Sequence, residues 1–199
     1  MKVSKEKAAE HRAAIIRAAS RLFRERGFEV GVAEITRAAG LTHGGFYGHF
    51  ASKDALAVEA FDAAFARSVK RIAVRAAPDG GGLPRYLDSY LSAAHRDAPQ
   101  EGCPMAAVAT QVGHQDTQVQ QGFASGIGAY IAAFESLLPE DDGGKGSSRR
   151  ARAILMVSAL VGGMALSRAV AQSDAALSEE ILEDVHAQLL ALAAPQISA

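Results

Sequence analysis

The stretch Ala33–Leu56, AEITRAAGLTHGGFYGHFASKDAL, decides the fold of this chain. A short helical pattern of apolar residues stops at Gly40, and a turn at Leu41-Thr42 precedes a second short helix that Thr42 can cap and that runs to Phe50. Two short helices joined by a tight turn leave the second one protruding from the surface. The spacing therefore predicts a helix-turn-helix.

The sequence on both sides adds further helices. Apolar residues recur at spacings of three and four up to Gly27, which predicts a helix over Lys5–Arg26. Val32–Ala39 repeats the spacing for about two turns, and Ser52 can cap a long helix that continues through Ile72.

A break at Pro78–Gly82, rich in proline and glycine, separates off a C-terminal half. Its apolar patterns predict helices over residues 83–95, 105–112, 119–138, 148–172 and 178–193, with loops at 99–104 and 140–148. We therefore expect an all-α fold of about nine helices: an N-terminal three-helix helix-turn-helix domain over residues 1–52, a connecting helix over 53–76 and a C-terminal helical domain over 83–199.

Composition agrees with this fold and limits the cellular setting. Abundant Ala and Leu, few aromatic residues and no Trp favour helices over strands. The sole cysteine cannot form an internal disulfide, and the first residues lack the apolar core of a secretory signal, so we expect a cytoplasmic protein. The apolar stretch Ala153–Ser167 is shorter than the roughly 20 residues that span a bilayer, which favours a buried helix and no membrane partner.

Charge is unevenly distributed along the chain. Residues 1–76 hold 14 Lys and Arg against 8 Asp and Glu, a net charge of +6, whereas residues 77–199 hold 7 against 14, a net charge of −7. The basic N-terminal part is therefore the candidate polyanion-binding face. A protruding helix there has the width that suits the major groove of double-stranded DNA.

The segment Ala33–Leu56 resembles the tetracycline-repressor (TetR) family of transcriptional regulators. The resemblance rests on Ala38-Ala39-Gly40, Leu41-Thr42, Phe46-Tyr47 with His49-Phe50, and Ser52–Leu56, together with Phe23 and Gly27-Phe28. It implies a homodimeric, ligand-responsive repressor that binds operator DNA. An activator, or a constitutive DNA-binding protein without an effector, fits the same residues.

The resemblance implies contacts to the DNA backbone from Thr42, Tyr47, His49 and Lys53. Gly45 and Gly48 stand where the family more often has larger side chains, which favours close approach of backbone to DNA around Gly44 and Gly45. His43 is then the first candidate for reading bases, with Thr36 and Arg37 as weaker ones, and Lys2, Lys5, Lys7 and Arg12 form a candidate flexible arm. Packing alone is the alternative for Tyr47, and solvent exposure without a role is the alternative for His43. Phe46 and Phe50 are expected in the core.

The resemblance implies that the C-terminal half binds an unknown small-molecule effector and provides the dimer interface. Apolar and lightly polar side chains offer a pocket lining, although each of them also suits an ordinary core: Tyr86, Tyr90, Met105, Phe123, Tyr130, Phe134 and Met164. The last two helices carry more apolar residues than one domain of this size needs, which predicts a four-helix interface between two chains: Ile154, Leu155, Val161, Ile181, Val185 and Leu189.

Cys103 is a possible sensor of electrophiles or oxidants. It lies in a break before a short helix, where helix amides favour the thiolate, and Arg96 and His95 are close in sequence. The Gly-Cys pair resembles one in electrophile-responsive family members, while an inert buried thiol is the alternative.

An enzyme is not expected. Gly143–Ser147 lacks the spacing of a phosphate loop, Gly122–Gly126 misplaces its serine for a nucleophile elbow, and His95, Cys103 and His114 lack metal-ligand spacing. We accordingly expect no catalytic residue, no metal and no cofactor.

Overall fold

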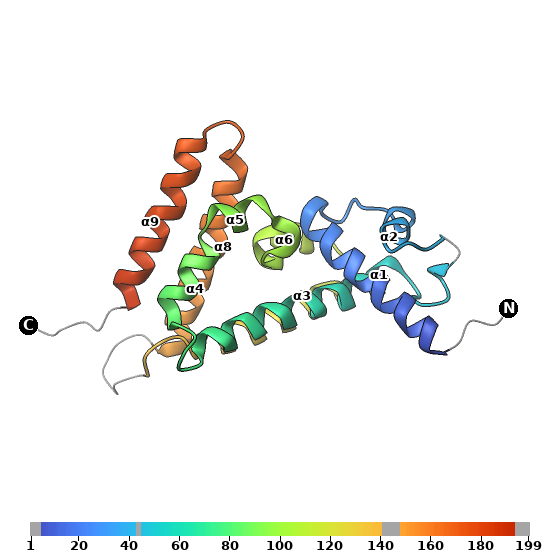
Figure 1. Cartoon of the computed structure of the whole chain (residues 1–199), viewed down its shortest axis with the longest axis horizontal. Coiled ribbons are helices and arrows are strands. Elements are labelled where there is room, and N and C mark those ends of the chain that lie inside the picture. The colour runs from blue at the N-terminus through green and yellow to red at the C-terminus, as the bar shows by residue number, and fades with distance from the viewer. Residues whose placement is uncertain (1–4, 43–44, 141–147, 194–199) are drawn as a thin grey trace, which may run out of the picture. The chain divides into compact units, whose positions relative to one another are not determined.

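The computed structural model describes residues 5–42, 45–140 and 148–193. Within these ranges the chain consists of helices and connecting turns without strands, and the predicted all-α class is confirmed (Figure 1). The elements in chain order are α1 (Lys5–Arg26), α2 (Val32–Ala38), α3 (Lys53–Ala76), α4 (Gly82–Tyr90), α5 (Ala93–Asp97), the 3-10 turn η2 (Pro99–Glu101), α6 (Pro104–Val112), α7 (Thr117–Glu135), α8 (Arg149–Val170) and α9 (Ala175–Ala193).

The residue contacts divide the chain into two compact units. Unit 1 holds the residues up to Ala66 together with Pro99–Ile127, and unit 2 holds Arg67–Ala98 together with the residues from Gly128 onward. The boundary after Ala66 falls inside the long helix α3, and the boundary after Ile127 falls inside the long helix α7. The expected functional division at residues 52, 76 and 83 stays a prediction.

Unit 1 is built around a cluster of phenylalanine rings. Phe23 and Phe28 stack at 5.5 Å between centroids, Phe61 lies 5.5 Å from Phe28, and Phe123 of α7 meets Phe61 edge to face at 5.3 Å. Ring pairs at these distances stabilise beyond the area that they bury. The cluster fixes α1, α3 and the first half of α7 on one another.

Unit 1 also holds α6 against the end of α1. The Arg24 side chain is buried, and its Nη1 donates to the Gly102 carbonyl at 2.9 Å. The Phe28 amide donates to Oε1 of Gln111 at 3.1 Å. The segment from Pro99 through α6 is therefore joined to α1 by buried and half-buried hydrogen bonds, since a buried polar group left unsatisfied is costly.

The helix predicted over residues 83–95 is two helices, and that prediction was wrong. Leu91 ends α4 with φ −93° and ψ 56°, and Ser92 starts α5 by accepting a hydrogen bond from the His95 amide at 3.2 Å. A serine side chain that satisfies a free amide favours a new helix start over continuation.

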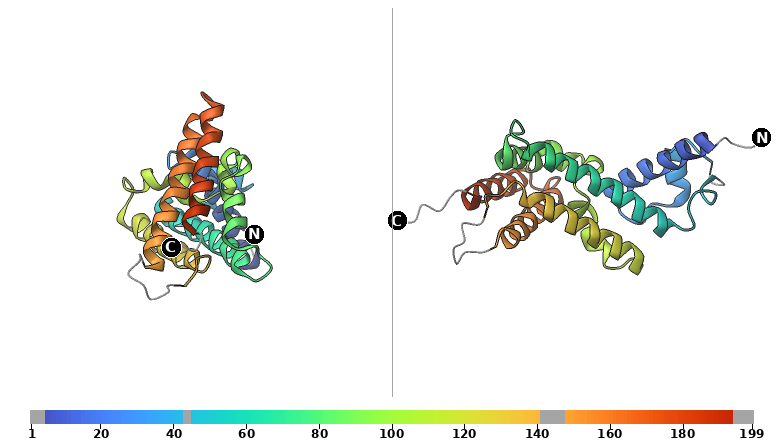
Figure 2. Two further views of the ribbon diagram at one scale, coloured as in Figure 1. Left: turned by 90° about the vertical axis from the view of Figure 1, so that its left-hand side faces the viewer. Right: turned by 90° about the horizontal axis from the view of Figure 1, so that it is seen from below.

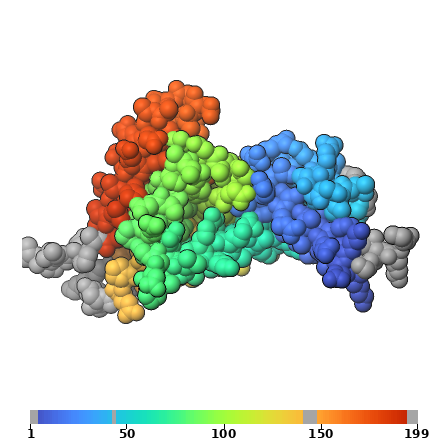
Figure 3. Space-filling view, in the orientation of Figure 1, coloured from blue at the N-terminus to red at the C-terminus, as the bar shows by residue number. Residues whose placement is uncertain are grey.

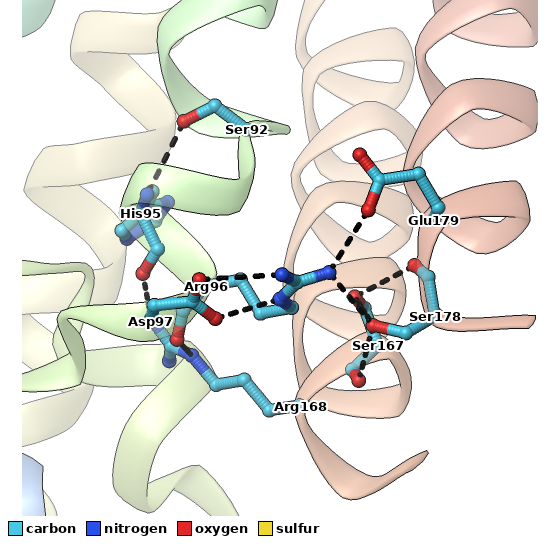
Figure 4. Close-up of polar contacts among 8 residues, drawn as sticks. All are labelled: Ser92, His95, Arg96, Asp97, Ser167, Arg168, Ser178 and Glu179. Atoms are coloured by element: carbon cyan, nitrogen blue, oxygen red, sulfur yellow. Dashed lines mark hydrogen bonds and ion pairs between the residues drawn. The ribbon is translucent and has the colours of Figure 1, made fainter. Parts of the chain in front are cut away.

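In unit 2 the short helix α5 is tied to α8 and α9 by two arginines (Figure 4). Arg168 of α8 donates to the backbone carbonyls of His95 and Arg96 at 2.7 and 3.0 Å. Arg96 in turn donates to Ser178 and Glu179 of α9 at 3.1 and 3.2 Å. We call these residues the α5 clamp: Arg96, Asp97, Ser167, Arg168, Ser178 and Glu179.

Helix α8 lies side by side with α9 along most of its length (Figures 1 and 2). Ala153, Met156, Leu160 and Met164 face inward and are buried, whereas Ile154, Leu155 and Leu166 are exposed. Among the described helices, α8 meets the length and hydropathy of a membrane span, a test that core helices of soluble proteins also pass. The expected buried helix is thus covered on one side by its own unit.

Candidate DNA-binding surface

The segment between α2 and α3 carries most of the residues expected to contact DNA. Its described part, Gly45–Phe50, follows turns in place of the regular helix expected over Thr42–Phe50. The Phe50 amide donates to the Phe46 carbonyl at 3.0 Å, and the Gly45 amide donates to the Thr42 carbonyl at 3.0 Å. Glycine lowers helix stability by about 1 kcal/mol relative to alanine, so Gly45 and Gly48 favour this looser path.

Aromatic residues of the segment divide between core and surface. Phe46 and Phe50 are buried and stack on each other, as the sequence predicts. Tyr47 is 67% exposed, and its ring meets the Phe46 ring edge to face at 5.2 Å. The Tyr47 side chain is therefore held by the core at its base and presents its ring outward, a placement that suits a contact to a phosphate.

His49 and Lys53 lie close to this tyrosine in the chain and are both half-buried. The His49 ring lies 6.4 Å from that of His11 on α1, edge to face. The Lys53 ammonium donates to the Phe28 carbonyl and thereby joins the start of α3 to the turn after α1. An ammonium has three donors, so this hydrogen bond leaves Lys53 able to donate to a phosphate as well.

The two candidate base readers on α2 differ in placement. The Thr36 side chain is buried, and its hydroxyl donates to the carbonyls of Val32 and Ala33 at 3.0 and 3.1 Å. Arg37 is exposed. His43 and Gly44 lie outside the described residues, and Thr42 is exposed beside them.

Arg12 is not part of a flexible arm. It lies in the middle of α1, where its Nη2 donates to Oε1 of Glu59 at 2.6 Å and its guanidinium carbon lies 4.8 Å from the centre of the Phe50 ring. Lys5 and Lys7 are exposed in the first turn of α1, and Lys2 lies outside the described residues. Nothing in the spacing of apolar residues in α1 pointed to the Arg12 contacts.

The predicted effector residues are divided between the two units. Met105 and Phe123 belong to unit 1, where Phe123 packs on Phe65 at 5.1 Å. The other five are buried in unit 2. There the Tyr86 and Tyr130 hydroxyls are hydrogen-bonded to each other, and Phe134 meets Tyr86 edge to face at 5.7 Å.

Cys103 occupies the N-cap position of α6, as its place in the sequence predicts. Its backbone is extended, Pro104 opens the helix, and its side chain makes no capping hydrogen bond. The residue is 2% exposed. His95 and Arg96 belong to unit 2, where Nδ1 of His95 contacts the Tyr90 carbonyl at 2.6 Å and Arg96 lies in the α5 clamp.

The residues predicted at a dimer interface also differ in exposure. Ile154 and Leu155 are exposed, Val161, Ile181 and Val185 are half-buried, and Leu189 is already buried within its own unit. Leu166 and Leu177, which the sequence analysis did not single out, are 60% and 40% exposed. Their sequence positions, next to inward-facing residues of α8 and α9, could have indicated that they belong to an exposed apolar face.

Arg24 is a buried residue that sequence reasoning missed. It follows Ile15, Ala19 and Phe23 on the inward side of α1, where a charged residue is unusual. That misfit with the apolar pattern could have indicated a buried hydrogen-bonding role. Within the described residues no group of three His, Cys, Asp or Glu side chains is placed to hold a metal ion.

Comparison with known proteins relates the N-terminal region to one family. A sequence model described as bacterial regulatory proteins of the tetR family matches residues 15–60, which include α2 and the segment after it. A search of curated proteins found no significant match. Several solved structures have a fold similar to that of this chain over nearly its whole length.

Three of these structures illustrate the similarity. A TetR transcriptional regulator from Legionella pneumophila is 18% identical, with a TM-score of 0.75 over 98% of this chain and 100% of its own. One from Chloroflexus aurantiacus J-10-FL is 24% identical, with a TM-score of 0.74 over 94% and 95%. The reduced form of NemR from E. coli is 19% identical, with a TM-score of 0.74 over 94% and 99%. The family model therefore relates residues 15–60 of this chain to the tetR family of bacterial regulatory proteins, and the fold is similar to that of tetR-family regulators over nearly the whole chain.

Proposed function

We propose that this chain is a cytoplasmic, homodimeric transcriptional repressor that binds double-stranded operator DNA and releases it when an effector binds. The observation that carries the proposal is the division of the segment Gly45–Phe50 into a buried aromatic base and an exposed Tyr47. A basic N-terminal part supports it, because neutralising phosphates provides much of the affinity for DNA. The family's regulators act on DNA, and the tetR fold supports a DNA-binding regulator here.

Phosphate contacts in the proposal come from Thr42, Tyr47, His49 and Lys53. Arg37, exposed on α2, is the described side chain best placed to read a base, because Thr36 is buried with its hydroxyl on carbonyls of its own helix. His43, Gly44 and Gly45 complete the proposed surface from the sequence.

Selection from a duplex library with a random core tests DNA binding directly. We expect the wild type to enrich a two-fold symmetric site, because a dimer reads two half-sites. Tyr47→Phe removes one hydrogen bond to a charged group and is expected to weaken binding about tenfold or more. The salt dependence of its affinity stays that of the wild type, since the hydroxyl carries no charge.

Lys53→Ala is expected to weaken binding to all DNA sequences nearly equally. It should also reduce by about one the magnitude of the slope of the logarithm of the binding constant against the logarithm of the salt concentration. Lys70→Ala, an exposed lysine of the same helix within unit 2, is the matched control and leaves the slope unchanged. Failure to enrich any site would contradict the proposal, and a reporter placed behind the enriched site distinguishes repression from activation.

The proposed effector site lies among the aromatic residues of unit 2. The Tyr86 and Tyr130 hydroxyls, Tyr90, Phe134 and Met164 combine apolar surface with a few polar groups, the composition of small-molecule sites. Metabolites that abolish binding to the selected duplex identify the ligand class.

Cys103 is the proposed chemical alternative to a non-covalent effector. Its position at the start of α6, and the similarity of the fold to NemR, a protein whose reduced form has been crystallised, support a redox or electrophile signal. The test compares release of the selected duplex by wild type and Cys103→Ser after mild peroxide or a quinone, with intact mass measured. Equal release by both proteins would exclude Cys103.

A further inference from the structure

The segment Gly45–Phe50 needs support from outside itself to hold one geometry. It lacks the hydrogen-bond ladder of a regular helix, and two of its six residues are glycines. Glycine loses more conformational freedom on ordering than any other residue. A contact surface for DNA must nevertheless be ordered before binding, because ordering it during binding lowers affinity.

That support comes from α1 and α3. The guanidinium of Arg12 lies over the Phe50 ring at 4.8 Å and is joined to Glu59 of α3 at 2.6 Å. One position earlier in α1, the His11 ring meets that of His49 at 6.4 Å. Figure 3 shows the surface of α1 in blue beside the light blue surface of the residues that follow it in unit 1.

Each contact of Arg12 depends on the other. A guanidinium over an aromatic face is attracted by the negative charge of the ring, and a carboxylate that accepts from its edge fixes the plane of the group. Phe50 is 4% exposed and stacks on Phe46, whose ring supports Tyr47. A continuous set of contacts therefore runs from Glu59 through Arg12 to the exposed tyrosine.

We propose that Arg12 and Glu59 form a brace that positions Tyr47 and His49 for DNA, with Arg12 acting as a positioning residue and not as a phosphate contact. The inference rests on the proposed DNA binding. The half-exposed Arg12 side chain faces an equal and opposite charge at hydrogen-bond distance. Its net electrostatic attraction for phosphate is therefore small.

A positioning role and a phosphate-contacting role for Arg12 predict opposite changes in DNA affinity for Glu59→Gln. If Arg12 contacted phosphate, Glu59→Gln would release it and remove a negative charge, so affinity for DNA would rise. In the brace, Glu59→Gln removes the charge that fixes the guanidinium, so affinity falls although the protein becomes more positive. Glu10→Gln, at an exposed acid on α1, is the matched charge control and leaves affinity unchanged or raises it slightly.

The experiment measures the affinity of wild type, Arg12→Met, Glu59→Gln, the double variant and Glu10→Gln for the duplex that the wild type selects, over a series of salt concentrations. We expect Arg12→Met and Glu59→Gln each to weaken binding about tenfold, within the range of coupled neighbouring residues, and the double variant to be no weaker than either. The salt slope stays at the wild-type value, and amide exchange of Gly45–Phe50 accelerates while that of α2 does not.

Tighter binding by Glu59→Gln would overturn the brace, as would a salt slope lowered by about one in Arg12→Met. Unchanged affinity in both single variants would overturn it too. Wild type that selects no duplex would instead contradict the proposed function itself. Arg12→Lys separates shape from charge, because an ammonium lacks the flat group that covers the ring, and its affinity is expected to resemble that of Arg12→Met.

Discussion

Gly27 and Gly40 end α1 and α2 with positive φ angles of 76° and 73°. A side chain in this left-handed region costs roughly 1–2 kcal/mol. The two residues differ in what surrounds them: a Cβ on Gly27 would lie 2.3 Å from Oε1 of Gln111, whereas a Cβ on Gly40 would meet nothing within 4 Å. The pair therefore separates backbone strain from a lost contact.

Gly40→Ala is expected to lower the free energy of unfolding by about 1 kcal/mol, from backbone strain alone. Gly27→Ala is expected to lower the free energy of unfolding by at least about 1 kcal/mol more than Gly40→Ala does. The reason is that Gln111 must move, so that the Phe28 amide loses its acceptor. Urea denaturation of both variants checks the difference. Equal losses would show that the Gln111 contact contributes nothing.

At the scale of elements, small residues let helix α7 approach α3 closely. A Cβ on Gly126 would lie 2.1 Å from the ring of Phe65, whereas a Cβ on Gly128, two positions along the same helix, would meet nothing within 4 Å. Close packing of these helices therefore requires glycine at residue 126 and not at residue 128.

Gly126→Ala is expected to destabilise the protein by about 1–3 kcal/mol, the range for overpacking a filled core. Gly128→Ala is expected to stabilise it by up to about 1 kcal/mol through helix propensity. Thermal unfolding monitored by circular dichroism measures both. A stabilising Gly126→Ala would mean that Phe65 moves aside without cost.

The α5 clamp gives unit 2 a polar contact whose strength depends on pH. Arg96, by a side-chain hydrogen bond above all, holds the pKa of the Asp97 carboxyl below its ordinary value. A carboxyl with a lowered pKa in the folded state stabilises above its unfolded pKa and loses that contribution as the pH falls through its folded value. The contribution is therefore present at neutral pH and lost below about pH 4.

Arg168→Met is expected to release α5, because it removes the donor to the carbonyls of His95 and Arg96. Amide exchange of Ala93–Asp97 should accelerate at neutral pH, with exchange in α2 unchanged. In the wild type, acid should reduce the protection of these amides, relative to their intrinsic exchange rates, by less than Arg168→Met does, because protonation of Asp97 leaves the Arg168 hydrogen bonds in place. Identical exchange in variant and wild type would show that packing alone holds α5.

Sequence periodicity predicted most of these elements because the helices of this chain bury regular apolar faces. The bounds of α1 agree with the prediction, and Gly27 ends it as expected. The break at Ser92 was missed because one capping hydrogen bond, not a change in apolar spacing, separates α4 from α5. Arg12 and Arg24 were missed for the same kind of reason, since their partners lie on other elements that spacing within α1 does not reveal.

On the scale of the whole molecule, the outer face of α8 exposes large apolar side chains to solvent. Leu155 and Leu166 are 59% and 60% exposed, and Gly162 between them has open space around it. Large apolar side chains beside a small residue allow two helices to pack closely, and homodimers commonly use one such surface twice. The proposed dimer would bury this face against its copy.

Leu155→Glu is therefore expected to yield a folded monomer, because the side chain is largely exposed within its own chain and would lie against the second copy in the proposed dimer. Val74→Glu is the matched control: Val74 is also a large apolar residue, 56% exposed, but lies on α3, and its replacement should leave the dimer intact. Leu189→Glu, at a residue already buried, should instead unfold unit 2. Sedimentation velocity at micromolar concentration, with circular dichroism to verify folding, separates the three results.

DNA binding should follow the oligomeric state of these variants. A monomer reads one half-site, so Leu155→Glu should lose most of its affinity for a two-fold symmetric duplex while binding a single half-site as weakly as the wild type does. Val74→Glu should bind the symmetric duplex like the wild type. A Leu155→Glu protein that stays dimeric would place the interface elsewhere, and one that is monomeric yet binds the symmetric duplex with full affinity would show that dimerisation is not what brings two DNA-binding units together.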